Sequence, residues 1–307
     1  MSSAGKWIIG IVAAFAGMGF IILAMAVFML ATAVTAPESD TYEESWGGTS
    51  SDRVALIEIE TPIFDAEDVV RQLRKYRQWN TVKAIVLRLD SPGGAVVPSH
   101  EIYEEVLRTE KHGKPVVVSM GSVAASGAYY IACGASRIVS NPGTITGSIG
   151  VVSEFASFGE LLDKIGIETT IIKSGEYKDI GNPAREMRDR EREHLQRTID
   201  NIYDQFVEVV VRGRQLSDDS VRTLADGRIF TGEQAYGLGL VDTLGTLQTA
   251  VTIAGTLGKI EGEPRITRER EEESLMDIVL GAQTRQTIED MGTRLRNQSP
   301  LEYRLIY

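Results

Sequence analysis

The stretch PVVVSMGSVAASGAYYIACGA, residues 115–135, holds an apolar strand pattern, a serine loop and a helical pattern in direct succession. Consecutive valines favour a buried strand, and the small and apolar residues that follow fit a helix. Ser126 lies where the two meet, in Ala-Ala-Ser-Gly-Ala, so nothing bulky stands directly beside it. This pattern is typical of a tightly packed strand-to-helix turn, and it also suits a serine that another molecule must reach.

Strand and helix patterns alternate on both sides of this stretch. We predict strands over 53–61, 82–91, 115–120 and 137–141, and a further strand followed by a polar loop within 164–179. We predict helices over 66–79, 99–111, 124–135 and 185–216, with shorter helical segments in 217–227, 231–242 and 246–258. Alternation of this kind, with Val/Ile-rich strands, predicts an α/β domain with a largely parallel sheet.

In parallel sheets, functional sites lie beyond the carboxyl ends of the strands. Two segments fall at such ends: the loop Asp90-Ser91-Pro92-Gly93-Gly94 and the segment that leads into Ser126. A Pro-Gly-Gly loop can simply turn the chain, and it can also aim backbone N–H groups at a neighbouring site.

The composition of the chain argues against several classes of function. The chain has 307 residues, enough for one large domain or two small ones. Its net charge of −11 argues against a nucleic-acid partner. Cys133 is the single cysteine, which excludes an intrachain disulfide, and the three histidines are scattered. With no Cys/His cluster at metal-ligand spacing, we expect neither a metal nor a cofactor.

Residues 7–36 run without a charge for 30 positions, longer than the roughly 20 apolar residues that span a bilayer core. We predict a single membrane anchor within 1–36, although Ala-Val-Thr-Ala at its end also fits a cleaved signal. Lys6 precedes the run and no basic residue follows until Arg53, so we expect a cytoplasmic N-terminus and an extracytoplasmic body. An acidic linker over 37–52, a catalytic domain over 53–260 and a charged tail over 261–307 complete the expected organisation. The final LEYRLIY fits an extra strand, a product-like segment in a binding groove, or a disordered end.

A serine nucleophile needs a base within hydrogen-bond reach, and histidine is the usual one. No histidine lies between Ser126 and His194, and we interpret His100 and His112 as surface residues. A Ser-His-Asp triad is therefore not expected. Lysine is the other candidate base, provided that desolvation lowers its pKa from about 10.4 to about 8, at a cost of roughly 3 kcal/mol.

Three lysines follow Ser126 before residue 180, namely Lys164, Lys173 and Lys178, and local sequence does not choose among them. Lys178 lies beside Glu176 and Asp179, which would raise its pKa if they pointed the same way.

Four ordered motifs carry a family resemblance. They are Asp90 to Gly94 (DSPGG), Gly121 to Gly127 (GSVAASG), Asn141 to Gly150 (NPGTITGSIG) and Lys173 to Lys178 (KSGEYK). With TGEQA at 231–235 and GLGLVD at 237–242, they make residues 53–260 resemble the signal peptide peptidases of the SppA type. The resemblance implies a Clp/crotonase-like fold with repeated β-β-α units and a Ser-Lys dyad.

Transferred to this chain, the dyad assigns Ser126 as the nucleophile and Lys178 as the general base. Ser148 resembles a family serine that hydrogen-bonds the lysine, and a turn serine is the other interpretation. Gly93, with Gly94 beside it, is the expected source of oxyanion-hole N–H groups. Ala128 departs slightly from the family pattern, in which a second glycine is frequent.

The resemblance also implies endopeptidase action on remnant signal peptides, a preference for small and apolar side chains, and assembly into a homo-oligomeric ring whose neighbouring subunits complete each site. Three alternatives stay open at this stage. They are a crotonase-like acyl-CoA enzyme, a non-enzymatic membrane scaffold, and a related Ser-Lys protease that cleaves one particular membrane protein.

Overall fold

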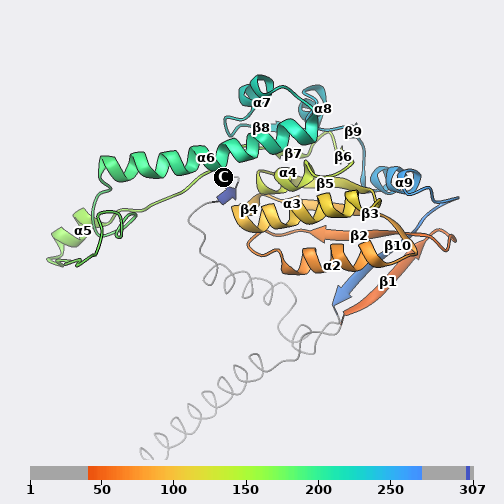
Figure 1. Ribbon diagram of the computed structural model, residues 1–307, viewed down its shortest axis with the longest axis horizontal. Coiled ribbons are helices and arrows are strands. Elements are labelled where there is room, and N and C mark those ends of the chain that lie inside the picture. The colour runs from red at the N-terminus through yellow and green to blue at the C-terminus, as the bar shows by residue number, and fades with distance from the viewer. Residues whose placement is uncertain (1–40, 272–301, 305–307) are drawn as a thin grey trace, which may run out of the picture. The chain divides into compact units, whose positions relative to one another are not determined.

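The computed structural model describes residues 41–271 and 302–304 (Figure 1). Among these residues, no helix is long and apolar enough to cross a membrane. The predicted anchor within 1–36 lies outside the described residues. Residues 43–269 and 302–304 belong to one compact unit, which holds the sheet and every predicted site residue.

Strands and helices alternate along the chain as the sequence predicts. The strands are β1 (Thr41–Gly47), β2 (Arg53–Ile59), β3 (Val82–Ser91), β4 (Gly93–Ala95), β5 (Val116–Ala125), β6 (Arg137–Ser140), β7 (Ile145–Gly147), β8 (Ile229–Thr231), β9 (Thr243–Leu244), β10 (Arg265–Glu271) and β11 (Glu302–Arg304). The helices are α2 (Glu67–Gln78), α3 (Val96–Lys111), α4 (Gly127–Ala132), α5 (Gly159–Lys164), α6 (Asp189–Arg214), α7 (Asp218–Leu224), α8 (Gly232–Gly237) and α9 (Leu247–Leu257).

Nine of the described strands form one large sheet, in which β1-β10-β2-β3-β5-β6-β9 lie in this order and β7 and β8 branch from β5, while β4 and β11 form a separate two-stranded sheet. Its central strands are parallel, while β8 runs antiparallel to β7, which itself pairs with the end of β5. The prediction of a largely parallel α/β sheet is confirmed, and the sheet is of mixed type. Since β2, β3 and β5 are buried on both faces, they consist of nearly continuous Val, Ile, Leu and Ala.

Two hydrophobic clusters cover the two faces of the sheet. The larger cluster joins alternate side chains of β2, β3 and β5 to α2, α3, α4 and the second half of α6. The smaller cluster joins the opposite side chains of the same strands to α9, and Figure 1 shows α9 apart from α2 and α3. Period-2 alternation within each strand places these two sets of side chains on opposite faces.

Several expected boundaries are corrected. Residues 41–47, predicted to belong to the acidic linker, form β1, and residues 265–271 of the predicted tail form β10, which pairs in parallel with β2. The segment 164–179, predicted to contain a strand, contains none. The strand of the serine stretch extends to Ala125 rather than ending at 120, so α4 begins only after Ser126.

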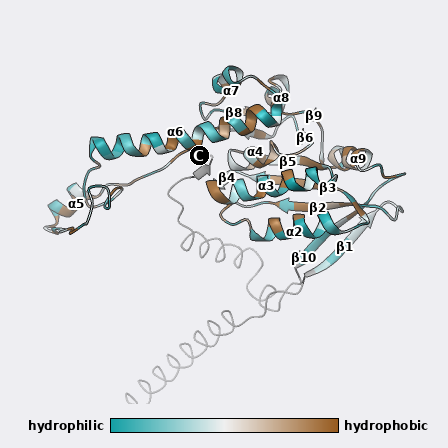
Figure 2. Ribbon diagram, in the orientation of Figure 1, coloured by the Kyte–Doolittle hydropathy of each residue, from teal (hydrophilic) through white to brown (hydrophobic). Residues whose placement is uncertain are grey.

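The segment 151–190 differs from the rest of the unit because none of its residues is buried. It includes α5 and several exposed apolar side chains, namely Phe155, Phe158, Leu161, Ile165, Ile167, Ile171 and Ile172. The first half of α6 is mostly hydrophilic and its second half mixes in apolar residues (Figure 2), which matches the burial of Phe206, Val207 and Val210. We call residues 151–190 the arm.

Candidate active site

Ser126 occupies the turn between β5 and α4 in a conformation that L-residues rarely adopt. Its backbone has φ 54° and ψ −115°, in a region that favours glycine. Its N–H donates a hydrogen bond to the Gly147 carbonyl at 2.8 Å, which helps to hold the turn. The side chain is only 1% exposed, and Oγ has no hydrogen-bond partner among the described residues. A strained, buried hydroxyl without a partner requires an explanation, and a functional role is the leading one.

Strand register places the glycine loop beside this serine. Ser91 pairs with Ala124, so the residues that follow on the two strands, Gly93 and Ser126, leave the sheet next to each other. In addition, α4 packs against β4. The sequence prediction that both segments meet at the carboxyl edge of the sheet is thus confirmed for the backbone.

Gly93 has φ 99°, which explains the glycine at this position. Its N–H donates to Ser91 Oγ at 3.2 Å, and its carbonyl accepts from the Ile63 N–H at 2.9 Å. An oxyanion bound here would therefore have to compete with the Ser91 hydroxyl for the Gly93 N–H. The Ser91 contact is a local one, between residues two apart in the same loop, whereas the Ile63 contact depends on how distant segments pair and carries no sequence signal.

Gly94 is required for close backbone packing. A Cβ atom at this position would lie 2.0 Å from the Ile63 carbonyl oxygen, far inside contact distance. The Ala95 N–H donates to the same oxygen at 2.7 Å, so β4 is held along one side by this segment.

The other side of β4 pairs with β11. The register is antiparallel, with Glu302 opposite Ala95, Tyr303 opposite Gly94 and Arg304 opposite Gly93. The prediction of an extra strand in the final segment is confirmed for residues 302–304. An extended chain therefore fits at the edge of the glycine strand, directly beside the serine turn.

Ser148 lies one residue after the carbonyl that accepts the Ser126 N–H. It has φ 50°, is nearly buried, and its N–H donates to the Arg228 carbonyl at 2.9 Å. Its backbone is thus close to Ser126, as the resemblance requires, while its proposed contact with a lysine stays a prediction.

Lys178 lies in the arm, on the loop between α5 and α6, and its side chain is exposed. Its N–H donates to the Gly175 carbonyl at 3.2 Å. Because Ser126 Oγ has no partner in the described chain, no Ser126–Lys178 hydrogen bond forms within one copy.

The acidic neighbours of Lys178 are engaged by other cations. Asp179 accepts from Lys173 and from Arg185, and these bonds, the one from Lys173 above all, lower the pKa of its carboxyl to about 2. Glu176 lies 3.7 Å from Arg190. Both acids next to Lys178 in the sequence therefore have their own cationic partners.

No histidine contacts Ser126 Oγ within the described residues. His100 and His112 are exposed, as predicted, and His100 Nδ1 contacts the Tyr130 hydroxyl at 2.9 Å. His194 is also exposed, on α6, with its ring 5.1 Å from that of Tyr177. In residues 41–271 and 302–304, no group of His, Cys, Asp and Glu is arranged to hold a metal ion.

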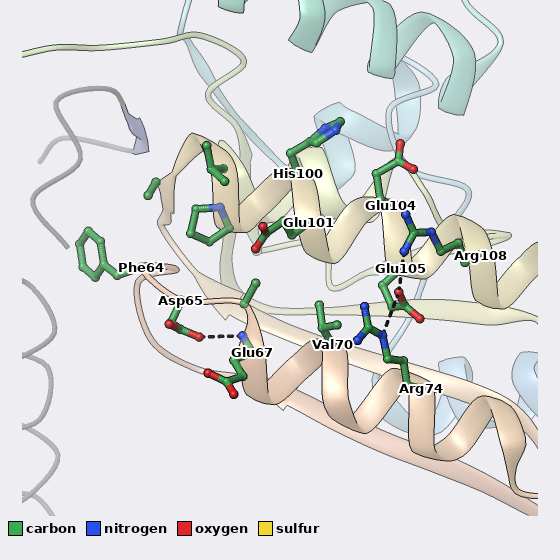
Figure 3. Close-up of a pocket in the computed structure, with 14 residues that line it drawn as sticks. Phe64, Asp65, Glu67, Val70, Arg74, His100, Glu101, Glu104, Glu105 and Arg108 are labelled. Carbon is green, nitrogen blue, oxygen red and sulfur yellow. Dashed lines mark hydrogen bonds and ion pairs between the residues drawn. The ribbon is translucent and has the colours of Figure 1, made fainter. Parts of the chain in front are cut away.

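A groove of about 930 Å³ starts beside β4 and runs between α2 and α3 (Figure 3). Its end near β4 is lined by the apolar residues Phe64, Ala66, Ala95, Val97 and Pro98. At its other end, the buried carboxylate of Glu105 forms ion pairs with Arg74 and Arg108, each at 3.4 Å. Asp65 and Glu67 line the same end as Phe64, so the groove offers both apolar surface and carboxylates next to the strand edge.

A buried serine on a strained strand-to-helix turn, beside a glycine strand of an α/β sheet, suits a nucleophilic serine, and the family matches give the class of protein. Residues 43–144 match the Clp protease family, and residues 108–261 match peptidase family S49. The chain belongs to peptidase family S49.

Three relatives agree with this assignment. A putative protease of Synechocystis is 48% identical over 178 residues, which cover 58% of this chain and 64% of that protein. Protease 4 of Haemophilus influenzae is 37% identical over 220 residues, which cover 67% of this chain and 35% of that protein. A putative signal peptide peptidase SppA of Enterococcus faecium is 36% identical over 188 residues, which cover 61% of this chain and 55% of that protein. The chain therefore aligns with about one third to two thirds of the length of these relatives.

Proposed function

We propose that this chain is a membrane-anchored serine endopeptidase in which Ser126 attacks the peptide carbonyl and Lys178 acts as the general base. The observation that carries the proposal is the backbone of Ser126, held at φ 54° with its buried Oγ unpartnered. Such strain persists only where the surrounding structure imposes it, and it clusters at active sites.

In the proposed reaction, neutral Lys178 Nζ takes the Ser126 proton while Oγ bonds to the substrate carbonyl carbon. The resulting oxyanion accepts hydrogen bonds from N–H groups at the Gly93-Gly94 loop and at the start of α4. When the C–N bond breaks, Lys178 returns the proton to the leaving amine. Water then hydrolyses the acyl-enzyme by the reverse sequence of proton transfers, which regenerates both residues.

We propose that a second copy of the chain supplies Lys178 to each site, within a homo-oligomeric ring. The support is that the lysine lies on an arm with no buried residue and with several exposed apolar side chains, while Ser126 Oγ has no partner in its own described chain. Packing this arm on a neighbour would bury its apolar surface and desolvate the lysine, and desolvation lowers a lysine pKa.

The proposed substrates are remnant signal peptides, held as an extended strand at the edge of β4. Residues 302–304 already occupy this edge in antiparallel register, so main-chain pairing there is sterically feasible. The apolar residues of the groove next to Ala95 suit small and apolar side chains. The uncharged segment 7–36 would hold the site near such substrates, with the catalytic domain outside the cytoplasm.

The proposal is tested with full-length protein in detergent and a fluorogenic apolar peptide. Ser126→Ala and Lys178→Ala are each expected to lose at least about a thousandfold in kcat/KM while they keep the wild-type unfolding temperature. Lys164→Ala, a lysine of the same arm that is paired with Glu160, is the matched control and is expected to stay active. Substantial activity in either dyad variant would overturn the assignment of that residue.

A further inference from the structure

One cluster of charged side chains in the arm is not used by the proposed reaction. Arg185 contacts two carboxylates that come from different segments. Its Nε and Nη2 lie 3.0 and 2.9 Å from Asp179 Oδ2, and its Nη1 and Nη2 lie 2.8 and 2.6 Å from the two carboxylate oxygens of Glu191. Its Nη2 also donates to the Asp179 main-chain carbonyl at 3.1 Å. One guanidinium thus connects the loop after α5 to the first turn of α6.

Both carboxylates are well enclosed, Asp179 in the arm and Glu191 directly after it in α6. The side chain of Asp179 is 9% exposed and that of Glu191 is 1% exposed. Arg188 adds contacts of 3.1 Å to each of them, and Glu191 also accepts from the Arg188 N–H at 3.0 Å. An Arg–carboxylate contact with two parallel hydrogen bonds fixes orientation as well as distance. A solvated loop does not require this degree of order.

This cluster directly adjoins the proposed general base in the chain. Asp179 is the residue directly after Lys178, and the turn around them is closed by backbone bonds from Lys178 to Gly175 and from Asn182 to Asp179. We propose that Asp179, Arg185 and Glu191 form a clamp that positions the Lys178 turn against α6, and that these three are positioning residues for the general base. This inference rests on the proposed function of Lys178.

The clamp also governs the charge around the lysine. Arg185 shares Asp179 and Glu191 with Lys173 and Arg188, so its removal leaves these two carboxylates less fully neutralised, and the added negative charge beside the turn favours the protonated, inactive lysine. Removal of the Asp179 charge leaves an excess of cations and favours the neutral lysine. The two changes therefore act on the pKa of Lys178 in opposite directions, which a merely structural role does not predict.

Other charged and titratable groups around the turn come from three elements. They are Lys173, Glu176 and Tyr177 from the preceding loop, the Glu160–Lys164 pair of α5, and Arg190 and His194 of α6. Lys173 also bonds Asp179, and Arg190 pairs with Glu176, so each acid adjacent to Lys178 has a cationic partner. Arg188 contacts both carboxylates as well, at 3.1 Å each, so Arg185 and Arg188 together link the turn to Glu191.

The test measures the apparent pKa of Lys178 without relying on activity. Full-length protein is labelled with trace acetic anhydride across a pH series, and the labelling rate of Lys178 is followed by peptide mass spectrometry. Arg185→Gln is expected to raise the apparent pKa of Lys178 by about one, and Asp179→Asn is expected to lower it, because each substitution changes the charge of the cluster beside the lysine by one unit. Arg192→Gln, another exposed arginine of α6, is the matched control and leaves the pKa unchanged.

The pH profile of kcat/KM provides the second readout. In Arg185→Gln, the acidic limb moves to higher pH by the same amount as the lysine pKa, so activity at a fixed pH below the limb falls about tenfold. Unchanged labelling and an unchanged limb in this variant, with Lys178→Ala inactive, would overturn the clamp while the dyad stands. If Lys178→Ala is active, the proposed function fails, whatever the labelling of the clamp variants.

Discussion

The strained backbone of Ser126 predicts that glycine at this position makes the protein more stable than alanine does, the reverse of the usual order. At an ordinary position, replacing alanine by glycine destabilises a protein by about 0.5–1 kcal/mol, because the unfolded glycine chain has more freedom to lose. At φ 54° and ψ −115° the alanine keeps the strain and the glycine does not. Strain of this kind costs about 1–3 kcal/mol. Subtracting the entropic cost leaves a net gain of about 1 kcal/mol for Ser126→Gly over Ser126→Ala.

The assay compares thermal unfolding of the two variants, both of which lack the nucleophile and are inactive on peptide. A gain of about 1 kcal/mol corresponds to about 2–4 °C in Tm for a domain of this size, with the glycine variant the more stable. Ser119→Gly against Ser119→Ala is the control, since Ser119 is buried within β5 and has no unusual backbone geometry, so its glycine variant is the less stable. A glycine variant of Ser126 that melts below its alanine variant would refute the claim of backbone strain.

Three further predictions concern the strand edge and the arm. Gly94→Ala places a Cβ 2.0 Å from the Ile63 carbonyl oxygen and should lower both Tm and kcat/KM. Gly237→Ala, which has open space around it, is the control and should change neither. Wild-type activity in a folded Gly94→Ala protein would contradict the geometry. Deleting residues 302–307 should lower KM, because β11 occupies the β4 edge, and added LEYRLIY peptide should then inhibit; an unchanged KM would show that substrate binds elsewhere. The pKa of both clamp carboxyls is lowered to about 2, so their stabilising effect is complete above about pH 4.5 and is lost as pH falls toward 2. Protection against hydrogen exchange in residues 173–191, taken relative to the intrinsic exchange rate at each pH, should therefore fall between about pH 4.5 and pH 2, and uniform protection across that range would contradict a clamp.

The fold was largely predictable because its signal is local. Continuous Val/Ile runs mark strands that are buried on both faces, and the helix patterns over 66–79 and 185–216 reappear as α2 and α6 with boundaries that differ by a few residues. The edge strands β1, β10 and β11 were missed or left open, because their residues are charged and polar. These strands exist through pairing with distant parts of the chain, which local patterns do not encode.

The candidate site was likewise predictable only in part. Ser126 and Gly93 could be placed together, since parallel strands bring their carboxyl ends to one edge. The packing of Gly94 on Ile63 could not, because it depends on how distant segments pair, and the local bond from the Gly93 N–H to the Ser91 hydroxyl was not foreseen. Lys178 was selected by resemblance alone. Ser126 Oγ has no partner within the described chain. Its proposed contact with Lys178 lies between two copies, so the sequence pattern of one chain does not predict it.

The central claim is that Ser126 of one copy meets Lys178 of another, and mixing two inactive variants tests it most directly. Ser126→Ala and Lys178→Ala chains, carrying different tags, are co-expressed, and the doubly tagged complex is purified in detergent and assayed on the fluorogenic peptide. In a random ring, about one site in four combines an intact serine with an intact neighbouring lysine, so activity should return to about a quarter of the wild-type value. Purified mixed complexes that stay inactive would contradict a dyad shared between copies.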